Sequence, residues 1–207
     1  GGSSGIGRAI AIAAARAGAD VGLTYRANEA GANAVASDIR ETGQRAVIVR
    51  ADIARQDDLA QLVTTIQAAL GRVDAWVNNA GADILTGQSA TLSRRDKLDL
   101  LLSVDLRGTM LASWAAADLM REQSEGGLII NMSWDRVLQG MEGENPELFA
   151  AVKGGVLGFS RSLARSVAPK IRVNVIAPGW ITTAFGADAP AAFRDERFLA
   201  TPGLEEL

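Results

Sequence analysis

The chain has 207 residues, 48% of them hydrophobic and 22% charged, and its 21 basic and 24 acidic residues leave a net charge of −3. This composition predicts one globular domain over residues 1–207 with a substantial core. No basic block appears, which argues against a nucleic-acid partner. The absence of His and Cys excludes imidazole catalysis, thiol nucleophiles, disulfides and Cys/His metal sites, so we expect no metal centre. The missing cysteines are also compatible with a cytoplasmic location.

Short apolar segments alternate with amphipathic ones along the chain. The predicted strands are residues 21–25, 46–50, 75–78, 128–132 and 172–176. The predicted helices are residues 8–17, 30–42, 57–70, 95–123 and 148–168. This alternation indicates an α/β fold with a doubly wound parallel sheet that helices cover on both faces. No uninterrupted apolar run reaches the ~18–20 residues that a membrane span needs, so we expect no membrane association.

A glycine-rich segment opens the chain and leads into the first predicted helix. It reads Gly1-Gly2-Ser3-Ser4-Gly5-Ile6-Gly7. Small residues let backbone amides approach a pyrophosphate, and a helix N-terminus adds unpaired N–H groups and a favourable dipole. An ordinary surface loop is the alternative interpretation. The strand that follows and the motifs further along the chain favour a dinucleotide site at this segment.

Four motifs in the expected order resemble those of the short-chain dehydrogenase/reductase family. The opening segment is similar to T-G-x-x-x-G-x-G without its threonine, and Lys153 stands where the active-site helix of the family carries its lysine. The other two are Asn78-Asn79-Ala80-Gly81, similar to N-N-A-G, and Asn174 with Pro178-Gly179-Trp180-Ile181 and Thr183, similar to N-x-x-x-P-G-x-I-x-T. The resemblance covers residue 1 to about residue 185 and implies a Rossmann-like fold and an oxidoreductase that uses a nicotinamide cofactor.

The resemblance also concerns the two ends of the chain. In the family a first strand lies in the middle of the sheet and precedes the glycine segment, and a further helix and strand usually follow the last motif. We therefore expect that the domain is incomplete at both ends and that the natural protein has residues beyond those given. An intact mass equal to 21.6 kDa would contradict this expectation.

The resemblance assigns cofactor contacts to residues at the carboxyl ends of the strands. Arg26 follows a strand after which NAD-dependent enzymes of this fold often carry an acidic residue. A guanidinium there can pair with a ribose 2′-phosphate, so NADP(H) is favoured over NAD(H), unless Arg26 is a solvated surface charge. Arg8 lies on the adjacent helix. Asp52 stands beside the expected adenine position, although the start of a loop and helix explains it nearly as well. The remaining predicted contacts are Asn79, Ala80, Gly81, Lys153, Pro178, Gly179, Ile181 and Thr183.

The family catalyses with Asn, Ser, Tyr and Lys, and only the lysine is retained here. The Y-x-x-x-K motif reads Phe149-Ala150-Ala151-Val152-Lys153, so Phe149 stands at the tyrosine position. Trp134 stands at the serine position, and Asp105 stands at the asparagine position. Ser133 is one residue early, and strand alternation would turn it to the opposite face. The only tyrosine of the chain, Tyr25, belongs to the adenosine end.

A carboxyl group is the remaining candidate for a replacement acid, because burial can raise its pKa. Asp135 is the best candidate, although a salt bridge with Arg136 or another arginine is the stronger interpretation. The other acidic side chains around the expected site are Glu142, Glu144 and Glu147. Two functions stay open: an NADP(H)-dependent carbonyl/alcohol oxidoreductase with an altered acid, or a catalytically inactive nucleotide-binding scaffold, partner subunit or sensor.

Family members usually form homodimers or homotetramers through the long helix and the active-site helix. Four small residues of the predicted helix 95–123 would permit close packing between helices, either across such an interface or inside one protomer: Ala112, Ala115, Ala116 and Ala117. A small-molecule substrate is implied but not identified. Four apolar residues are candidates for its pocket wall or for the core: Leu138, Met141, Trp180 and Phe185.

Overall fold

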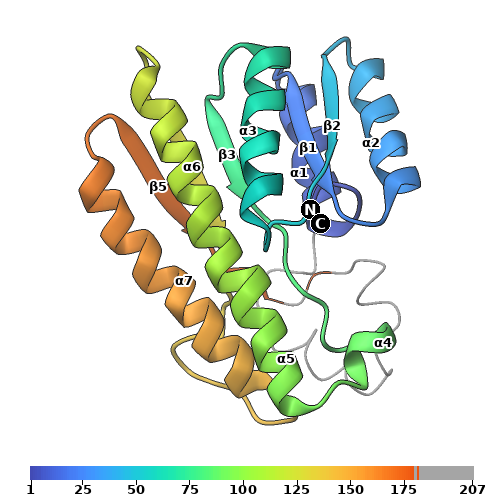
Figure 1. Ribbon diagram of the computed structural model, residues 1–207, viewed down its shortest axis with the longest axis vertical. Coiled ribbons are helices and arrows are strands. Elements are labelled where there is room, and N and C mark those ends of the chain that lie inside the picture. The colour runs from blue at the N-terminus through green and yellow to red at the C-terminus, as the bar shows by residue number, and fades with distance from the viewer. Residues whose placement is uncertain (180, 182–207) are drawn as a thin grey trace.

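The computed structural model describes residues 1–179 and 181. Within them, parallel strands alternate with helices that flank the sheet, as predicted (Figure 1). The strands are β1 (Val21–Tyr25), β2 (Ala46–Arg50), β3 (Ala75–Asn78), β4 (Gly127–Met132) and β5 (Ile171–Ile176). The helices are α1 (Gly5–Arg16), α2 (Glu29–Glu41), α3 (Gln56–Leu70), α4 (Gly87–Ala90), α5 (Arg94–Leu101), η1 (Leu102–Gly108), α6 (Thr109–Glu122) and α7 (Pro146–Val167). None of these helices is long and apolar enough to cross a bilayer.

The strands form two parallel groups, β1-β2 and β3-β4-β5. Pairing of Val21 with Ala46 and of Tyr25 with Arg50 aligns the ends of β1 and β2. Pairing of Asn78 with Asn131 aligns the end of β3 with β4. The carboxyl ends of the strands in each group therefore lie at one edge, where parallel α/β proteins place their ligands.

Apart from shifts of one or two residues at the ends, two helices differ from the sequence prediction, and the short helix α4 was not predicted. The first begins at Gly5 instead of residue 8, because Gly5-Ile6-Gly7 already forms its first turn. The long helix runs through α5, η1 and α6, but its middle part, Leu102–Gly108, is π-helical. A π-helical stretch inserts extra residues into a turn, and such stretches are frequent at functional sites. Asp105 lies in this stretch, which the 3.6-residue period does not reveal.

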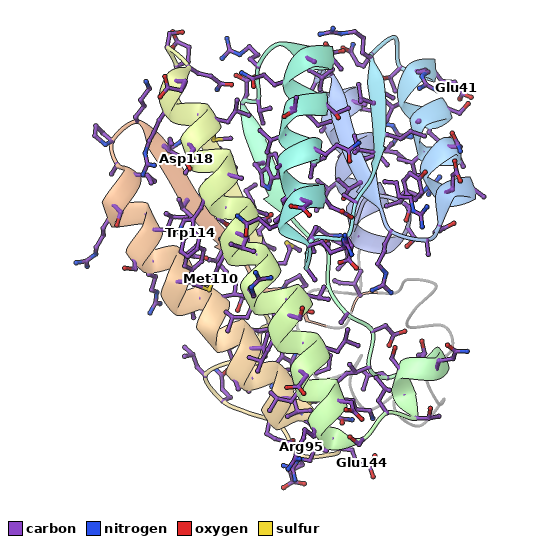
Figure 2. The ribbon with its side chains drawn as sticks, viewed as in Figure 1. Glu41, Arg95, Met110, Trp114, Asp118 and Glu144 are labelled. Carbon is purple, nitrogen blue, oxygen red and sulfur yellow. The ribbon has the colours of Figure 1, made fainter. Side chains whose placement is uncertain are left out.

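Two hydrophobic clusters hold the helices against the strands. Around β3-β4-β5 the cluster includes the fully buried Met120 and Ile129. Ala112, Ala116 and Ala117 belong to this cluster, so they pack inside the protomer and are not available to a partner subunit. Around β1-β2 a second cluster joins α1 and α2. Figure 2 shows Met110, Trp114 and Asp118 on the outer side of α6.

A buried polar network fixes the carboxyl ends of β3 and β4. Asn131 accepts hydrogen bonds from Asn78 Nδ2 at 2.8 Å and from Ser113 Oγ at 3.2 Å, and it donates to Ser160 Oγ at 2.8 Å. Trp76 Nε1 donates to Asn78 Oδ1 at 2.8 Å. Every polar group is thereby paired, which makes such a network stabilising in a low-dielectric interior. It joins β3, β4, α6 and α7 directly beneath the candidate site.

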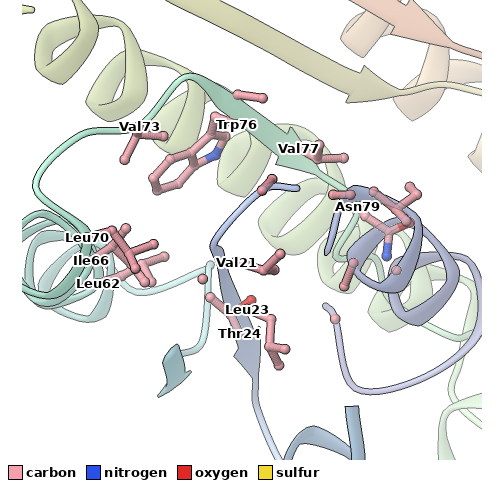
Figure 3. Close-up of a pocket in the computed structure, with 18 of the residues that line it drawn as sticks. Val21, Leu23, Thr24, Leu62, Ile66, Leu70, Val73, Trp76, Val77 and Asn79 are labelled. Carbon is pink, nitrogen blue, oxygen red and sulfur yellow. The ribbon is translucent and has the colours of Figure 1, made fainter. Parts of the chain in front are cut away.

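A cavity of about 540 Å³ separates the two groups of strands. It is lined by residues of β1, such as Val21 and Leu23, and of β3, such as Trp76, together with Ile66 and Leu70 of α3 (Figure 3). The β1 and β3 strands are not hydrogen-bonded to each other across it. The predicted cofactor contacts Gly1, Gly7 and Asn79 also line this cavity, whereas Lys153 and Asp105 do not.

Candidate functional site

The start of α1 presents backbone amides without side-chain caps. Ser4 is the N-cap residue, its side chain makes no capping hydrogen bond, and the first turn carries no acidic residue. Gly5 has a φ of 53°, a left-handed conformation that glycine adopts at low cost. The predicted contacts Ser3, Ser4 and Gly5 therefore lie at a helix N-terminus that is free to bind an anion.

The segment after β3 packs against this glycine segment. Asn79 Nδ2 donates to the carbonyl oxygen of Gly1 at 2.8 Å. A Cβ on Gly1 would lie 2.7 Å from the Cα of Ala80, and a Cβ on Gly7 would lie 1.9 Å from the oxygen of Gly1. These approaches require glycine at both positions. The structure thus brings together predicted cofactor contacts that are far apart in the sequence.

Lys153 and Asp105 form a buried ion pair beside Gly81, in the segment after β3. Lys153 Nζ lies 2.9 Å from Asp105 Oδ1, and the two side chains are 13% and 2% exposed. Asp105 Oδ2 also accepts the backbone N–H of Ala82 at 2.8 Å, and Lys153 Nζ donates to the oxygen of Met132 at 3.4 Å. A Cβ on Gly81 would lie 2.9 Å from Asp105 Oδ1. The carboxylate therefore holds both the lysine and the segment after β3.

Aromatic rings occupy the two positions at which hydroxyl groups are expected. The ring centroids of Trp134 and Phe149 are 6.2 Å apart with an interplanar angle of 55°, a tilted contact that is favourable for aromatic pairs. Ser133 is buried, and its Oγ donates to the carbonyl oxygen of Lys153 at 2.9 Å. This hydroxyl thus binds the backbone of α7. The contact fits the prediction that Ser133 and Trp134 face opposite sides of the strand.

Acidic side chains near the site are paired with arginines or lie at the surface. Asp135 Oδ2 is 3.7 Å from Arg136 Nε, the geometry of the salt-bridge interpretation. Glu147 pairs with Arg94 at 2.6 Å, while Glu142 and Glu144 are exposed. The backbone N–H of Asp135 donates to the oxygen of Pro178 at 3.3 Å, which places Pro178 beside the end of β4. Gly179 and Ile181 follow it, whereas Trp180, Thr183 and Phe185 lie outside the described residues.

At the adenosine end, Arg26 is exposed and directly follows β1. Arg8 is not free for a ligand, because its Nη2 binds Asp38 Oδ2 at 2.8 Å. Asp52 accepts the N–H of Ala54 at 3.0 Å, so it helps to shape the turn before α3, in agreement with the structural interpretation of this residue. Arg26 is therefore the predicted ligand for the 2′-phosphate whose side chain has no partner among the described residues.

Comparisons with known proteins agree with this geometry. A family model described as enoyl-(acyl carrier protein) reductase matches residues 1–200. Human 3-oxoacyl-[acyl-carrier-protein] reductase is 39% identical over 186 residues, which cover 88% of this chain and 74% of that protein. A short-chain dehydrogenase/reductase from Serratia marcescens has a TM-score of 0.83 and 34% identity, covering 95% of this chain and 78% of that one. The chain belongs to the short-chain dehydrogenase/reductase family. A Burkholderia cenocepacia short chain dehydrogenase in complex with NADP has a TM-score of 0.82 and 36% identity, covering 93% of this chain and 77% of that one.

Within the short-chain dehydrogenase/reductase family, this chain is an oxidoreductase-type protein whose retained lysine has an unexpected partner. The sequence prediction placed Asp105 at the asparagine position of the family and named no partner for its side chain. It missed the direct bond between the two side chains. No spacing in the sequence connects the two positions, because Asp105 and Lys153 meet only where η1 packs against α7.

Proposed function

We propose that this chain binds NADP(H) across the carboxyl ends of its strands and transfers a hydride between the nicotinamide and a carbonyl or alcohol group. The observation that carries the proposal is the cradle formed by the uncapped start of α1, Gly7 and Asn79. The unpaired Arg26 supports a 2′-phosphate ligand over a plain ribose. The NADP complex of the Burkholderia relative supports the same cofactor.

The residues of this chain divide the work between binding and proton supply. The cofactor, when bound, supplies or accepts the hydride. Backbone amides of Ser3, Gly5 and Ile6 at the start of α1 would hold the pyrophosphate, and the segment Asn79–Gly81 the adenosine ribose. The Lys153 ammonium, kept in place by Asp105, would bind the nicotinamide ribose. Asp135 stays the proposed replacement acid, with its salt bridge to Arg136 as the competing role.

Without a tyrosine or serine hydroxyl at the reacting carbonyl, turnover is expected to be slow. General acid–base catalysis contributes about 10²–10⁴-fold, roughly 3–5 kcal/mol of barrier. Trp134 can donate a hydrogen bond but cannot usefully release a proton. Cofactor binding uses other residues, so the affinity for NADP(H) should be retained.

A second candidate function is favoured by one observation, the contact between Trp134 and Phe149. These rings occupy space that a substrate carbonyl would need. On this reading the chain is a catalytically inactive NADP(H)-binding scaffold, partner subunit or sensor. The two candidates share the cofactor and differ only in turnover.

The experiment that separates them measures binding and turnover on the same preparation. NADPH should raise the melting temperature of the chain. NADPH oxidation is then followed with ketones, aldehydes, quinones and 3-oxoacyl thioesters, the last because several relatives are named for such substrates. Turnover that Asp135→Asn or Lys153→Ala abolishes supports the oxidoreductase, whereas tight binding without turnover on any substrate supports the inactive protein. No thermal shift with NADPH would overturn both.

Restoring the two hydroxyl groups tests whether the pocket is otherwise intact. Phe149→Tyr combined with Trp134→Ser should create or raise reductase activity by about 10²-fold or more, in proportion to the acid–base contribution. The matched control is Phe159→Tyr with Trp114→Ser, the same changes in a second ring pair whose centroids are 5.9 Å apart. No gain over the control would mean that the site differs by more than these side chains.

We also propose that the chain forms a homodimer or homotetramer through α6 and α7 and acts in the cytoplasm. Trp114 is 46% exposed on α6 (Figure 2). It packs edge-on against Phe159 of α7, and Leu102 of η1 is 40% exposed. Contiguous exposed apolar patches mark interaction surfaces, and the proposal takes Trp114 and Leu102 as parts of one. Trp114→Glu should give a monomer in light scattering. An unchanged oligomer would place the interface elsewhere.

A further inference from the structure

Two arginines lie side by side at the carboxyl ends of β1 and β2. Arg50 is the last residue of β2 and pairs in register with Tyr25, the residue before Arg26. Arg50 Nε donates to the backbone oxygen of Arg26 at 3.4 Å, which draws the Arg50 guanidinium toward the end of β1. Both residues are exposed. The Arg50 guanidinium therefore lies beside the backbone of Arg26 at one corner of the site.

Neither guanidinium is paired with a carboxylate among the residues that the structure describes. Asp58 is an acidic side chain on which the charge of Arg50 acts, but its carboxylate already has other partners. It accepts the backbone N–H of Asp52 at 2.8 Å and binds Arg55 Nε at 3.3 Å. The N–H of Asp52 is the largest cause that lowers the pKa of Asp58, and the charge of Arg50 is the smallest. Arg50 thus keeps its guanidinium available for an added anion.

The glycine segment lies against the same end of β1. The N–H of Gly2 donates to the oxygen of Thr24 at 2.8 Å. A Cβ on Gly31 of α2 would lie 2.6 Å from the oxygen of Ser3, so the segment also touches the start of α2. A nucleotide whose pyrophosphate occupies the start of α1 therefore has its adenosine ribose beside Arg26 and Arg50.

We propose that Arg50 is a specificity-determining residue that forms, with Arg26, a two-guanidinium clamp for a phosphomonoester on the adenosine ribose. This inference rests on the proposed function, because it concerns the 2′-phosphate of NADP(H). The hydrogen bond from Arg50 Nε to the backbone oxygen of Arg26 orients the Arg50 guanidinium. The two Nη groups of Arg50 are left to bind phosphate oxygens. Charge-assisted bonds of this type are strong and directional. Arg8 does not take part, since Asp38 holds it.

The test compares nucleotides that differ only in the 2′-phosphate. Dissociation constants of NADPH and NADH are measured by the fluorescence of the bound nucleotide, and those of adenosine 2′,5′-bisphosphate and AMP by calorimetry. Arg50→Ala should weaken binding of the two 2′-phosphorylated ligands by about 10- to 100-fold and leave the other two unchanged. Arg50→Lys should have an intermediate effect, because lysine keeps the positive charge and lacks the paired donors of the guanidinium. The double variant with Arg26→Ala should lose the preference for NADPH.

The matched control is Arg40→Ala. Arg40 Nη2 donates to the oxygen of Ala46 at 3.0 Å, so it too binds a backbone oxygen of this sheet, at the opposite end of β2. Its loss should not alter either affinity. A wild-type preference for NADPH that Arg50→Ala leaves intact would overturn the clamp but keep the proposed function. A wild type without any preference, or without binding, would overturn both the clamp and the proposed cofactor.

Discussion

Replacing Lys153 by methionine removes the cation from a buried carboxylate. The Asp105 side chain is 2% exposed, and the Lys153 ammonium lies 2.9 Å from its Oδ1. Among the described residues, the variant leaves Asp105 with the N–H of Ala82 as its remaining donor. Methionine fills much of the volume of the lysine stem, so the change is mainly the loss of charge. The perturbation therefore measures the electrostatic part of the contact.

The expected loss is large for a single substitution. Breaking a buried ion pair on one side costs about 3–5 kcal/mol, because the other charge stays buried without compensation. The residual exposure of Lys153 at 13% places this pair near the lower end of that range. One kcal/mol lowers the melting temperature of a domain of this size by about 2–4 °C, so we expect a drop of roughly 10 °C.

The assay is urea unfolding of the protein without nucleotide, with thermal melting beside it. Lys153→Met should be destabilised strongly, and adding Asp105→Asn should restore part of the stability, because the asparagine carries no charge and still accepts the N–H of Ala82. The matched control is Lys170→Met, since Lys170 is exposed and binds only the oxygen of Arg121. Its effect should stay within about 0.5 kcal/mol. A double variant no more stable than Lys153→Met would show that the unpaired charge of Asp105 does not cause the loss of stability.

Three further predictions concern other parts of the molecule. Gly7→Ala should abolish the thermal shift with NADPH, because its Cβ would lie 1.9 Å from a backbone oxygen of the glycine segment, whereas Gly158→Ala, which meets no atom within 4 Å, should keep the shift. Desolvation and then the Glu29 carboxylate raise the pKa of Tyr25 above 10.0. Since the chain has one tyrosine, a tyrosinate absorbance titration should give a midpoint above this value that Glu29→Gln lowers; a midpoint at or below 10.0 would contradict it. Asn131→Ala should cost about 1–3 kcal/mol in urea unfolding, because the side chains of Asn78, Ser113 and Ser160 each lose one hydrogen bond, although Asn78 and Ser113 keep each other and Ser160 keeps the oxygen of Val156; a cost near zero would contradict this expectation.

The strand order along the chain and the glycine cradle could be predicted because their signals are local. Residues 21–25, 46–50 and 75–78 have the predicted strand bounds, since short apolar runs between glycines and charges mark them. The need for glycine at Gly7 follows from how closely a backbone must approach a phosphate or another backbone. Such requirements act on neighbouring residues and leave a readable pattern.

The ion pairs could not be predicted in the same way. Asp105 meets Lys153, and Arg8 meets Asp38, only after two helices have packed, so no spacing rule connects the partners. The π-helical stretch that carries Asp105 is equally invisible to a periodicity argument. The sequence therefore predicts that Asp105 stands at the catalytic asparagine position of the family, but not that its side chain binds Lys153.

Cofactor binding and proton supply impose physically different constraints on this fold. The cradle depends on the backbone, because a Cβ at Gly1 or Gly7 would collide with neighbouring main-chain atoms, and this leaves no tolerated replacement. The positions of Trp134 and Phe149 constrain only side-chain chemistry, and aromatic rings fill them without disturbing β4 or α7. Lys153 alone belongs to both sets. A chain of this family can therefore exchange its proton donors and keep its cofactor, so a thermal shift with NADPH and turnover on a carbonyl panel report on separable halves of the site.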